Sequence, residues 1–277
     1  MTERHGVYGA AGDPREKFGD ALRDARKTRK AGRISQTDLG RLSRTSKSTI
    51  SRIEGGVPPI AGNLPALFDQ IFETDGQFKR LYEDVVDQSY PAQYRRRMTL
   101  ERQATAILEW SPTLIPGLFQ TAEYARALFR CGYRRATEEN IAKMVRARLA
   151  RQEVLRSEAP PTVRVVVCES VIRRRIGSHD MMREQLAVLL GHGERPTTRV
   201  QVMPLDAEPH PLTDGAITLL TAPNHATTLC VEAYRTANIS DDPDNVRAAV
   251  RAYDDLSSEA LSARESAALI RKQMETL

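Results

Sequence analysis

The 277-residue sequence has few of the residues from which metal, disulfide or cofactor sites are built. Its three cysteines, Cys131, Cys168 and Cys230, are far apart and form no CxxC pair, so we expect free thiols in a reducing compartment. The histidines are scattered, without the close His/Cys spacing that is typical of zinc sites. No glycine-rich phosphate loop, dinucleotide fingerprint or nucleophile elbow occurs. We therefore expect no metal, no cofactor and no enzymatic activity.

Aromatic residues and long apolar runs are also scarce. Aromatics make up 5% of the chain, so its core must be mostly aliphatic. No stretch approaches the roughly 18 apolar residues of a membrane helix, and the N-terminus lacks the apolar segment of a secretory signal. We expect a cytoplasmic, nucleoid-associated protein that does not contact membranes.

Positive charge is concentrated in one segment. The chain carries 41 Lys and Arg against 36 Asp and Glu, a net charge of +5. Residues 14–56 hold 12 basic against 5 acidic residues, whereas the rest of the chain holds 29 against 31. The excess of positive charge therefore lies entirely within residues 14–56, which is typical of a module that faces phosphates.

Residues 35–56 have the pattern of two short helices joined by a tight turn. We expect the first helix at about residues 36–43, capped by Ser35, and the second at about residues 47–54, capped by Ser46 or Thr45. Gly55 and Gly56 end the second helix, because glycine readily adopts the left-handed conformation that follows a helix.

The second helix has two chemically different faces. Ile50 and Ile53 share one side, which can dock on Leu39 and Leu42 of the first helix. The opposite side and its flanks carry hydroxyls and cations, with no acidic residue before Glu54. Such a face suits a DNA major groove, where short polar groups read base edges and long cations reach guanine or phosphate. The pattern alone fits a solvated surface helix of a small bundle equally well.

This segment resembles the lambda-repressor-like helix-turn-helix family. The matching residues are Ser35, Gln36, Leu39, Ser46, Ser48, Ile50, Ser51, Ile53, Glu54 and Gly56. Gly40 stands where the family usually has alanine, and Arg44 stands where the turn glycine is usual, so Arg44 must adopt a left-handed conformation. The resemblance also implies a structural ion pair between Arg29, near the end of the preceding helix, and Glu54.

We accordingly expect a DNA interface on these two helices. Gln36 and Thr37 open the first helix and are predicted to contact phosphate, where capping is the alternative role. The complete predicted interface is Gln36, Thr37, Lys47, Ser48, Thr49, Ser51 and Arg52.

The rest of the chain predicts an α+β fold with two folded domains. We expect a disordered tail at residues 1–13, a five-helix DNA-binding domain at 14–89, a linker at 90–99, and a regulatory domain at 100–277. The linker contains Arg95, Arg96 and Arg97, which we interpret as solvated, with contact to the DNA backbone as the alternative. The last domain is predicted to be a small mixed sheet packed by helices, with strands at residues 163–168, 199–203, 216–221 and 228–234.

Residues beyond 100 resemble a companion domain found behind such helix-turn-helix domains in actinobacterial regulators. The resemblance rests on Glu101, Ala104, Pro116, Gly117, Leu118, Gln120, Thr121, Tyr124, Ala125 and Arg126, with further matches at 148–152, 169, 173–176, 185–190, 200–204, 231–232 and 260–266. It implies an antitoxin-like regulator, often encoded beside a small acidic protein that is its partner.

Two carboxylates are candidates for a ligand or partner site. Glu169 and Glu232 each end a predicted strand, where carboxylates often bind a ligand, and Arg173 is included in the candidate site. Structural pairing with Arg173, Arg174 or Arg175 is the alternative interpretation.

Taken together, these patterns predict a sequence-specific transcriptional regulator that binds a palindromic operator in double-stranded DNA as a homodimer. The C-terminal domain is expected to dimerise, through its final helices or residues 114–129, and to receive a protein partner. The competing interpretation is that these apolar stripes cover the sheet, or that they bind a small partner protein and the dimer forms only on DNA. The alternative is a one-component regulator whose C-terminal domain senses a small molecule.

Overall fold

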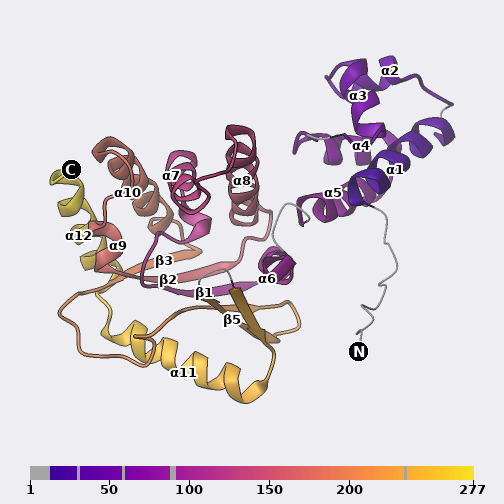
Figure 1. Ribbon diagram of the computed structural model, residues 1–277. Helices are drawn as coiled ribbons and strands as arrows, with labels where there is room; N and C mark the ends of the chain where they lie inside the picture. The colour runs from indigo at the N-terminus through magenta and orange to yellow at the C-terminus, as the bar shows by residue number, and fades with distance from the viewer. Residues whose placement is uncertain (1–12, 30–31, 58–59, 88–91, 234–235) are drawn as a thin grey trace, which may run out of the picture. The chain divides into compact units, whose positions relative to one another are not determined.

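A computed structural model describes residues 13–29, 32–57, 60–87, 92–233 and 236–277. The chain divides into two compact units, Met1–Ser89 and Tyr90–Leu277 (Figure 1). The described part of the first unit is helical, and that of the second is a mixed sheet of six strands with helices. The predicted α+β fold class is therefore confirmed, while the expected tail lies outside the described residues apart from Asp13.

The first unit consists, over its described residues, of five helices. They are α1 (Pro14–Thr28), α2 (Gln36–Leu42), α3 (Lys47–Glu54), α4 (Leu64–Phe72) and α5 (Gln77–Asp87). Side-chain caps set three of the starts: Asp13 accepts from the N–H of Arg15, Ser35 from that of Asp38, and Ser46 from that of Thr49. The predicted caps at Ser35 and Ser46 are thus confirmed, and each contributes about 1 kcal/mol.

An apolar core joins all five helices. Phe18 of α1, Phe68 of α4 and Phe78 of α5 are fully buried, with ring centroids 5.6–6.4 Å apart. Each such side chain contributes roughly 1.5–3 kcal/mol by burial. Leu39, Ile50 and Ile53 complete the contact between α2, α3 and α1, as predicted.

Two details of this packing matter for the site. Gly19 lets α1 approach α3 closely, because a Cβ at this position would lie 2.5 Å from the carbonyl oxygen of Ile53. The prediction that Leu42 docks on α3 was wrong, since this side chain is 44% exposed at the end of α2. Leu39, in the middle of the seven-residue α2, lies in the core. Leu42 is the last residue of this short helix and lies outside the core.

The second unit is built on a sheet with the order β3-β2-β1-β4-β5-β6. The strands are β1 (Ala106–Ser111), β2 (Thr162–Cys168), β3 (Thr198–Met203), β4 (Ala216–Thr221), β5 (Thr227–Ala233) and β6 (Thr236–Ser240). β1, β2 and β3 are parallel, while β4, β5 and β6 continue the sheet as antiparallel neighbours.

Helices cover both faces of this sheet (Figure 1). They are α6 (Ala92–Gln103), α7 (Ala122–Gly132), α8 (Glu138–Ala150), α9 (Glu169–Arg173), α10 (His179–Gly193), α11 (Pro243–Glu259) and α12 (Ala263–Glu275), with 3-10 turns η1 (Gly117–Phe119) and η2 (Arg151–Arg156). α10 and α12 pack on the face that presents Ile107 and Val165, and α11 packs on the face that presents Trp110 and Val166. Trp110 is buried, and its indole Nε1 donates to the carbonyl of Leu212 at 2.8 Å.

Three predictions about this unit need correction. The linker expected at residues 90–99 is wrong from residue 92 onward, because α6 begins there and Arg97 is 3% exposed. Strands β1 and β6 were not predicted. The final helices do not present their apolar stripe for dimerisation, since Leu256 and Ile270 are buried against the sheet and Leu269 packs on the same core.

Candidate nucleic-acid interface

The exposed face of α3 is polar and basic. Lys47, Ser48, Ser51 and Arg52 are exposed and Thr49 is half-buried, whereas Ile50 and Ile53 lie in the core. The Ser46 hydroxyl lies 2.7 Å from that of Ser48 and 2.9 Å from that of Thr49, so the cap orders both neighbouring hydroxyls. This face therefore offers cations and oriented hydroxyls to a ligand, as the sequence predicted.

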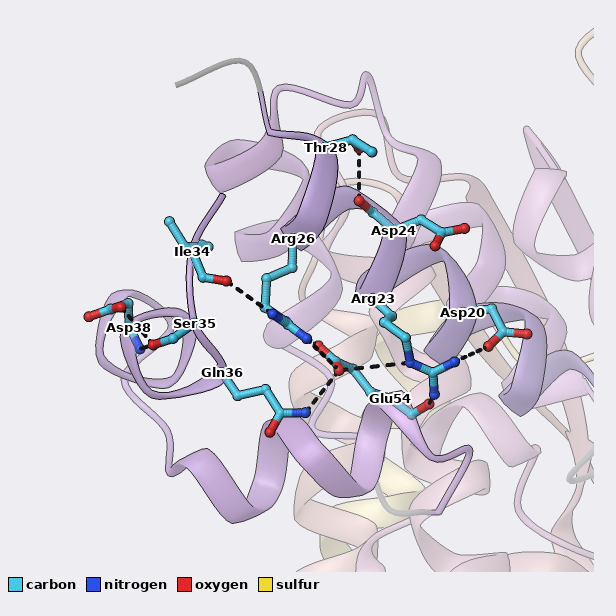
Figure 2. Close-up of polar contacts among 10 residues, drawn as sticks. All are labelled: Asp20, Arg23, Asp24, Arg26, Thr28, Ile34, Ser35, Gln36, Asp38 and Glu54. Atoms are coloured by element: carbon cyan, nitrogen blue, oxygen red, sulfur yellow. Dashed lines mark hydrogen bonds and ion pairs between the residues drawn. The ribbon is translucent and has the colours of Figure 1, made fainter. Parts of the chain in front are cut away.

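The one acidic side chain of α3 points away from this face, into the unit. Glu54 is 4% exposed and accepts two hydrogen bonds from Arg26, Nε–Oε1 at 2.6 Å and an Nη–Oε2 contact at 3.0 Å (Figure 2). The Gln36 amide donates to the same carboxylate at 2.9 Å, and Arg23 donates to the backbone carbonyl of Glu54. Three helices are thereby tied to one carboxylate, which also removes negative charge from the exposed face of α3.

The protonation of Glu54 follows from these contacts. Burial alone would raise the pKa of this carboxyl, but the hydrogen bonds from Arg26 and Gln36 and the positive charge of Arg26 outweigh it. Its pKa consequently lies below the usual value, and the group is ionised at neutral pH. Arg26 also donates to the carbonyl of Ile34 at 3.0 Å, which fixes the chain as it enters α2.

The expected ion pair between Arg29 and Glu54 was wrong in its arginine. α1 ends at Thr28, and Arg29 is the residue after the helix, whereas Arg23 and Arg26 lie one turn apart on the face that meets α3. Side chains at i and i+3 share a helix face, so these two arginines converge on Glu54. Arg29, three residues further on, follows the end of the helix and has a non-helical backbone, with ψ of 131°, so it does not continue that face. The acidic partner, Glu54, was predicted correctly.

The start of α2 differs partly from its prediction. Gln36 directs an amide N–H to Glu54, so its side chain has a structural role that the capping alternative did not foresee. Thr37 is exposed, and Ser35 exchanges hydrogen bonds with Asp38, at 3.1 Å to the N–H and 2.6 Å to the carboxylate. Phosphate contact by Gln36 and Thr37 stays a prediction, but a Gln36→Ala variant is now expected to lose stability as well.

The candidate carboxylates of the second unit do not share a site. The Glu169 carboxylate accepts hydrogen bonds from Arg173 Nε at 2.7 Å and from the N–H of Leu205 at 3.0 Å. Glu232 forms an ion pair with Arg97 of α6. Strands β1 and β4 separate β2, which precedes Glu169, from β5, which carries Glu232. Three strand spacings amount to about 14 Å, so the two carboxylates are too far apart to bind one small ligand group. Glu169 is paired with Arg173, as the alternative interpretation expected, whereas the partner of Glu232 is Arg97, which that interpretation did not include.

The residues behind the companion-domain resemblance form a structural network. Gln120 accepts from Arg148 at 2.6 Å and donates to the carbonyl of Ile115 at 2.6 Å. Arg151 forms two hydrogen bonds, at 2.8 and 2.6 Å, to Glu101, which is 2% exposed. A Cβ at Gly117 would lie 2.9 Å from Arg151, so glycine leaves room for this guanidinium. These motif residues hold η1, α6 and α8 together.

Sequence reasoning missed a buried charged group that extends this network. Arg97 donates to the Thr218 hydroxyl at 3.1 Å besides pairing with Glu232. Burial raises the pKa of the nearby Glu109 to about 7, although the positive charge of Arg97 opposes the shift. Arg97 sits among three consecutive arginines, so nothing in the local sequence distinguishes it from its exposed neighbours.

The part of the chain that the structure describes offers neither a metal site nor a membrane span. No cluster of three or more His, Cys, Asp or Glu side chains there could hold a metal ion. No helix among these residues has the length and apolarity to span a bilayer. Cys131, Cys168 and Cys230 are free thiols, as expected.

The fold and its sites define a two-part α+β chain, a compact helical unit followed by a six-stranded mixed-sheet unit. A family model described as a domain of unknown function (DUF5753) matches residues 94–272, and the chain belongs to this family. The match begins inside α6 and ends inside α12, so it covers almost all of the second unit. No curated protein and no solved structure matches the chain.

Proposed function

We propose that the chain is a sequence-specific DNA-binding transcriptional regulator of the lambda-repressor-like helix-turn-helix type, in which α3 enters the major groove. The observation that carries this proposal is the division of α3 into a buried apolar side and an exposed side of hydroxyls and cations. The inward position of Glu54, paired with Arg26, leaves the exposed side of α3 without an acidic residue.

Charge supports the same proposal. The segment 14–56 holds all of the net positive charge of the chain, and the acidic Glu54 within it is neutralised by Arg26. DNA binding by cations is driven by release of counterions from the phosphates, so a locally basic unit gains affinity that an evenly charged chain would not.

The roles of Arg52 and Lys47 can be separated by experiment. Full-length protein is used to select a duplex from a pool with randomised base pairs, and affinities are then measured against salt. Arg52→Ala should relax specificity at one base pair by about 1–3 kcal/mol, because a guanidinium can donate twice to guanine. Lys47→Ala should weaken binding to all sequences alike and lower the salt slope by about 0.9.

Lys79→Ala provides the matched control, since Lys79 is an exposed lysine of the same unit that lies on α5. This variant should bind as the parent does. If Lys47→Ala and Arg52→Ala also bound the selected duplex as the parent does, with the parent's salt dependence, docking through α3 would be wrong.

We infer further that the second unit dimerises and receives a small acidic protein partner. A single recognition helix reads only a few base pairs, and two-fold pairing lets two half-sites one helical turn apart, roughly 34–36 Å, be read together. Recovery of a small acidic protein with the full-length chain from its native cells would support the partner, and a metabolite released on denaturation would favour a small-molecule sensor. The sensor alternative gains nothing from Glu169 at the start of α9 and Glu232 on β5, which pair with different arginines.

A further inference from the structure

The turn between α2 and α3 places a non-glycine residue in a left-handed conformation. Arg44 has a φ of 52°, as expected for a residue at the turn position. The turn is tight because the N–H of Thr45 donates to the carbonyl of Gly40 at 2.8 Å. A Cβ at Gly40 would lie 3.0 Å from the carbonyl oxygen of Thr45, so the two helices meet closely here. Packing of α2 on α3 therefore sets this backbone geometry.

Glycine would satisfy this geometry better than arginine. A Cβ in the left-handed region crowds the following carbonyl, and glycine avoids that contact. The other described non-glycine residues with positive φ are Glu73, Asp75 and His225, none of which lies next to α3. The helical unit thus keeps an unfavourable residue at the entrance to its candidate recognition helix.

The side chain of Arg44 does not offset this cost within the protein. It is exposed, and among the described residues no hydrogen bond or ion pair involves its guanidinium. Its exposed neighbours Arg41 and Lys47 carry the same charge, and the carboxylate of Asp38 already faces Arg41 at 3.8 Å. In the free protein only water solvates this guanidinium, so an anion from outside the chain would supply the attraction that its neighbours do not.

We propose that Arg44 binds a phosphate of the DNA backbone beside the groove that α3 enters, an inference that rests on the function proposed above. Arg44 precedes the cap residue Ser46, so it lies outside the helix that would reach base edges. In a helix-turn-helix the first helix crosses the backbone and the second lies in the groove, so the turn between them passes the phosphates. A guanidinium can form two parallel hydrogen bonds to a phosphate, which suits this position better than a single ammonium.

Three substitutions in the full-length chain separate the cation from the backbone. Arg44→Ala and Arg44→Gly both remove the guanidinium, but only Arg44→Gly relieves the left-handed strain, and Arg44→Lys keeps the charge. The probe is the duplex selected from a randomised pool by the parent protein. Both Arg44→Ala and Arg44→Gly should bind every sequence more weakly, and their deficit should be about 3.5-fold smaller at 200 mM than at 50 mM salt, because each lost phosphate contact lowers the salt slope by about 0.9.

Thermal stability and DNA affinity should respond differently to these substitutions. The unfolding midpoint of the helical unit should be about 4–8 °C higher for Arg44→Gly than for Arg44→Ala, while their affinities stay equal. Arg44→Lys should keep the parent's salt slope. If Arg44→Ala and Arg44→Gly kept the parent's affinity and salt slope while Lys47→Ala bound more weakly, the phosphate contact of Arg44 would be overturned. The function proposed above would then still stand.

Two further outcomes would also count against it. A loss of affinity in Arg44→Ala that Arg44→Gly does not share would assign the effect to the backbone and would overturn the phosphate contact. If the parent selected no duplex at all, the proposed function would fail and this inference with it.

Discussion

Removal of Arg26 should destabilise the helical unit severely. Arg26→Ala leaves the buried carboxylate of Glu54 without its two-point partner, and a buried charge stripped of its partner costs about 3–5 kcal/mol. Gln36 and Arg23 still lie near the carboxylate, so we expect the lower end of this range. A unit of roughly 75 residues has a total stability of about 4–11 kcal/mol, so roughly a quarter to three quarters of it is lost. The unfolding midpoint should fall by at least about 12 °C.

The chain contains an internal means of assigning this loss to one unit. Its single tryptophan, Trp110, is buried in the sheet of the second unit, so tryptophan fluorescence reports that unit alone. Thermal or urea unfolding of the full-length variant would be followed by fluorescence and by circular dichroism in parallel. Arg26→Ala should shift part of the dichroism transition and leave the fluorescence transition in place.

Arg29→Ala is the matched control, because it makes the same change three residues later, just beyond the end of α1. It should alter stability by less than about 0.5 kcal/mol, as most surface substitutions do. If Arg29→Ala destabilised the unit as much as Arg26→Ala, or if Arg26→Ala were harmless, the assignment of the Glu54 partner to Arg26 would be refuted.

Three further predictions concern pH, the second unit and assembly. Since the pKa of Glu54 is lower in the folded state, its ionisation stabilises the helical unit above the unfolded-state pKa of about 4.3, and this stabilisation is lost as pH falls through the folded-state pKa. Glu54→Gln should therefore make the free energy of unfolding depend less on pH in the acid range. Arg151→Met should leave the buried Glu101 with only the more distant Arg97, at 4.0 Å, and cost the second unit about 3 kcal/mol, the lower end of the range for a broken buried pair, by Trp110 fluorescence. Arg156→Met, at a surface pair, should cost less than about 1 kcal/mol. Sedimentation should find the full-length chain dimeric at micromolar concentration and residues 1–90 monomeric, and a dimeric fragment would move the dimer contact to the helical unit.

Local signals explain what could be predicted. The caps Ser35 and Ser46 act within three residues of themselves, so sequence alone places the starts of α2 and α3. The apolar positions Ile50 and Ile53 give the buried side of α3 by helical periodicity. Strand β2 is visible because Val163 and Val165–Val167 are β-branched and apolar, with Arg164 as the one charged residue among them.

Contacts between distant segments explain what could not. The choice of Arg26 over Arg29 depends on where α1 ends and on which of its faces meets α3, and neither follows from the local pattern. Arg97 pairs with Glu232, which lies 135 positions later in the chain, so the sequence around Arg97 predicts only a solvated linker. β1 was missed because Glu109 interrupts its apolar run, and its burial, which raises the pKa of the carboxyl to about 7 despite the positive charge of Arg97, is not visible in the local sequence.

The central claim, that α3 reads DNA sequence, is tested most directly by genome-wide mapping of binding sites for the parent and for Arg52→Ala. The parent should enrich one palindrome whose half-site centres lie roughly 34–36 Å apart, and Arg52→Ala should lose preference at one symmetric pair of positions. Recovery of no common sequence by the parent, or of the same palindrome with undiminished preference by Arg52→Ala, would contradict the account.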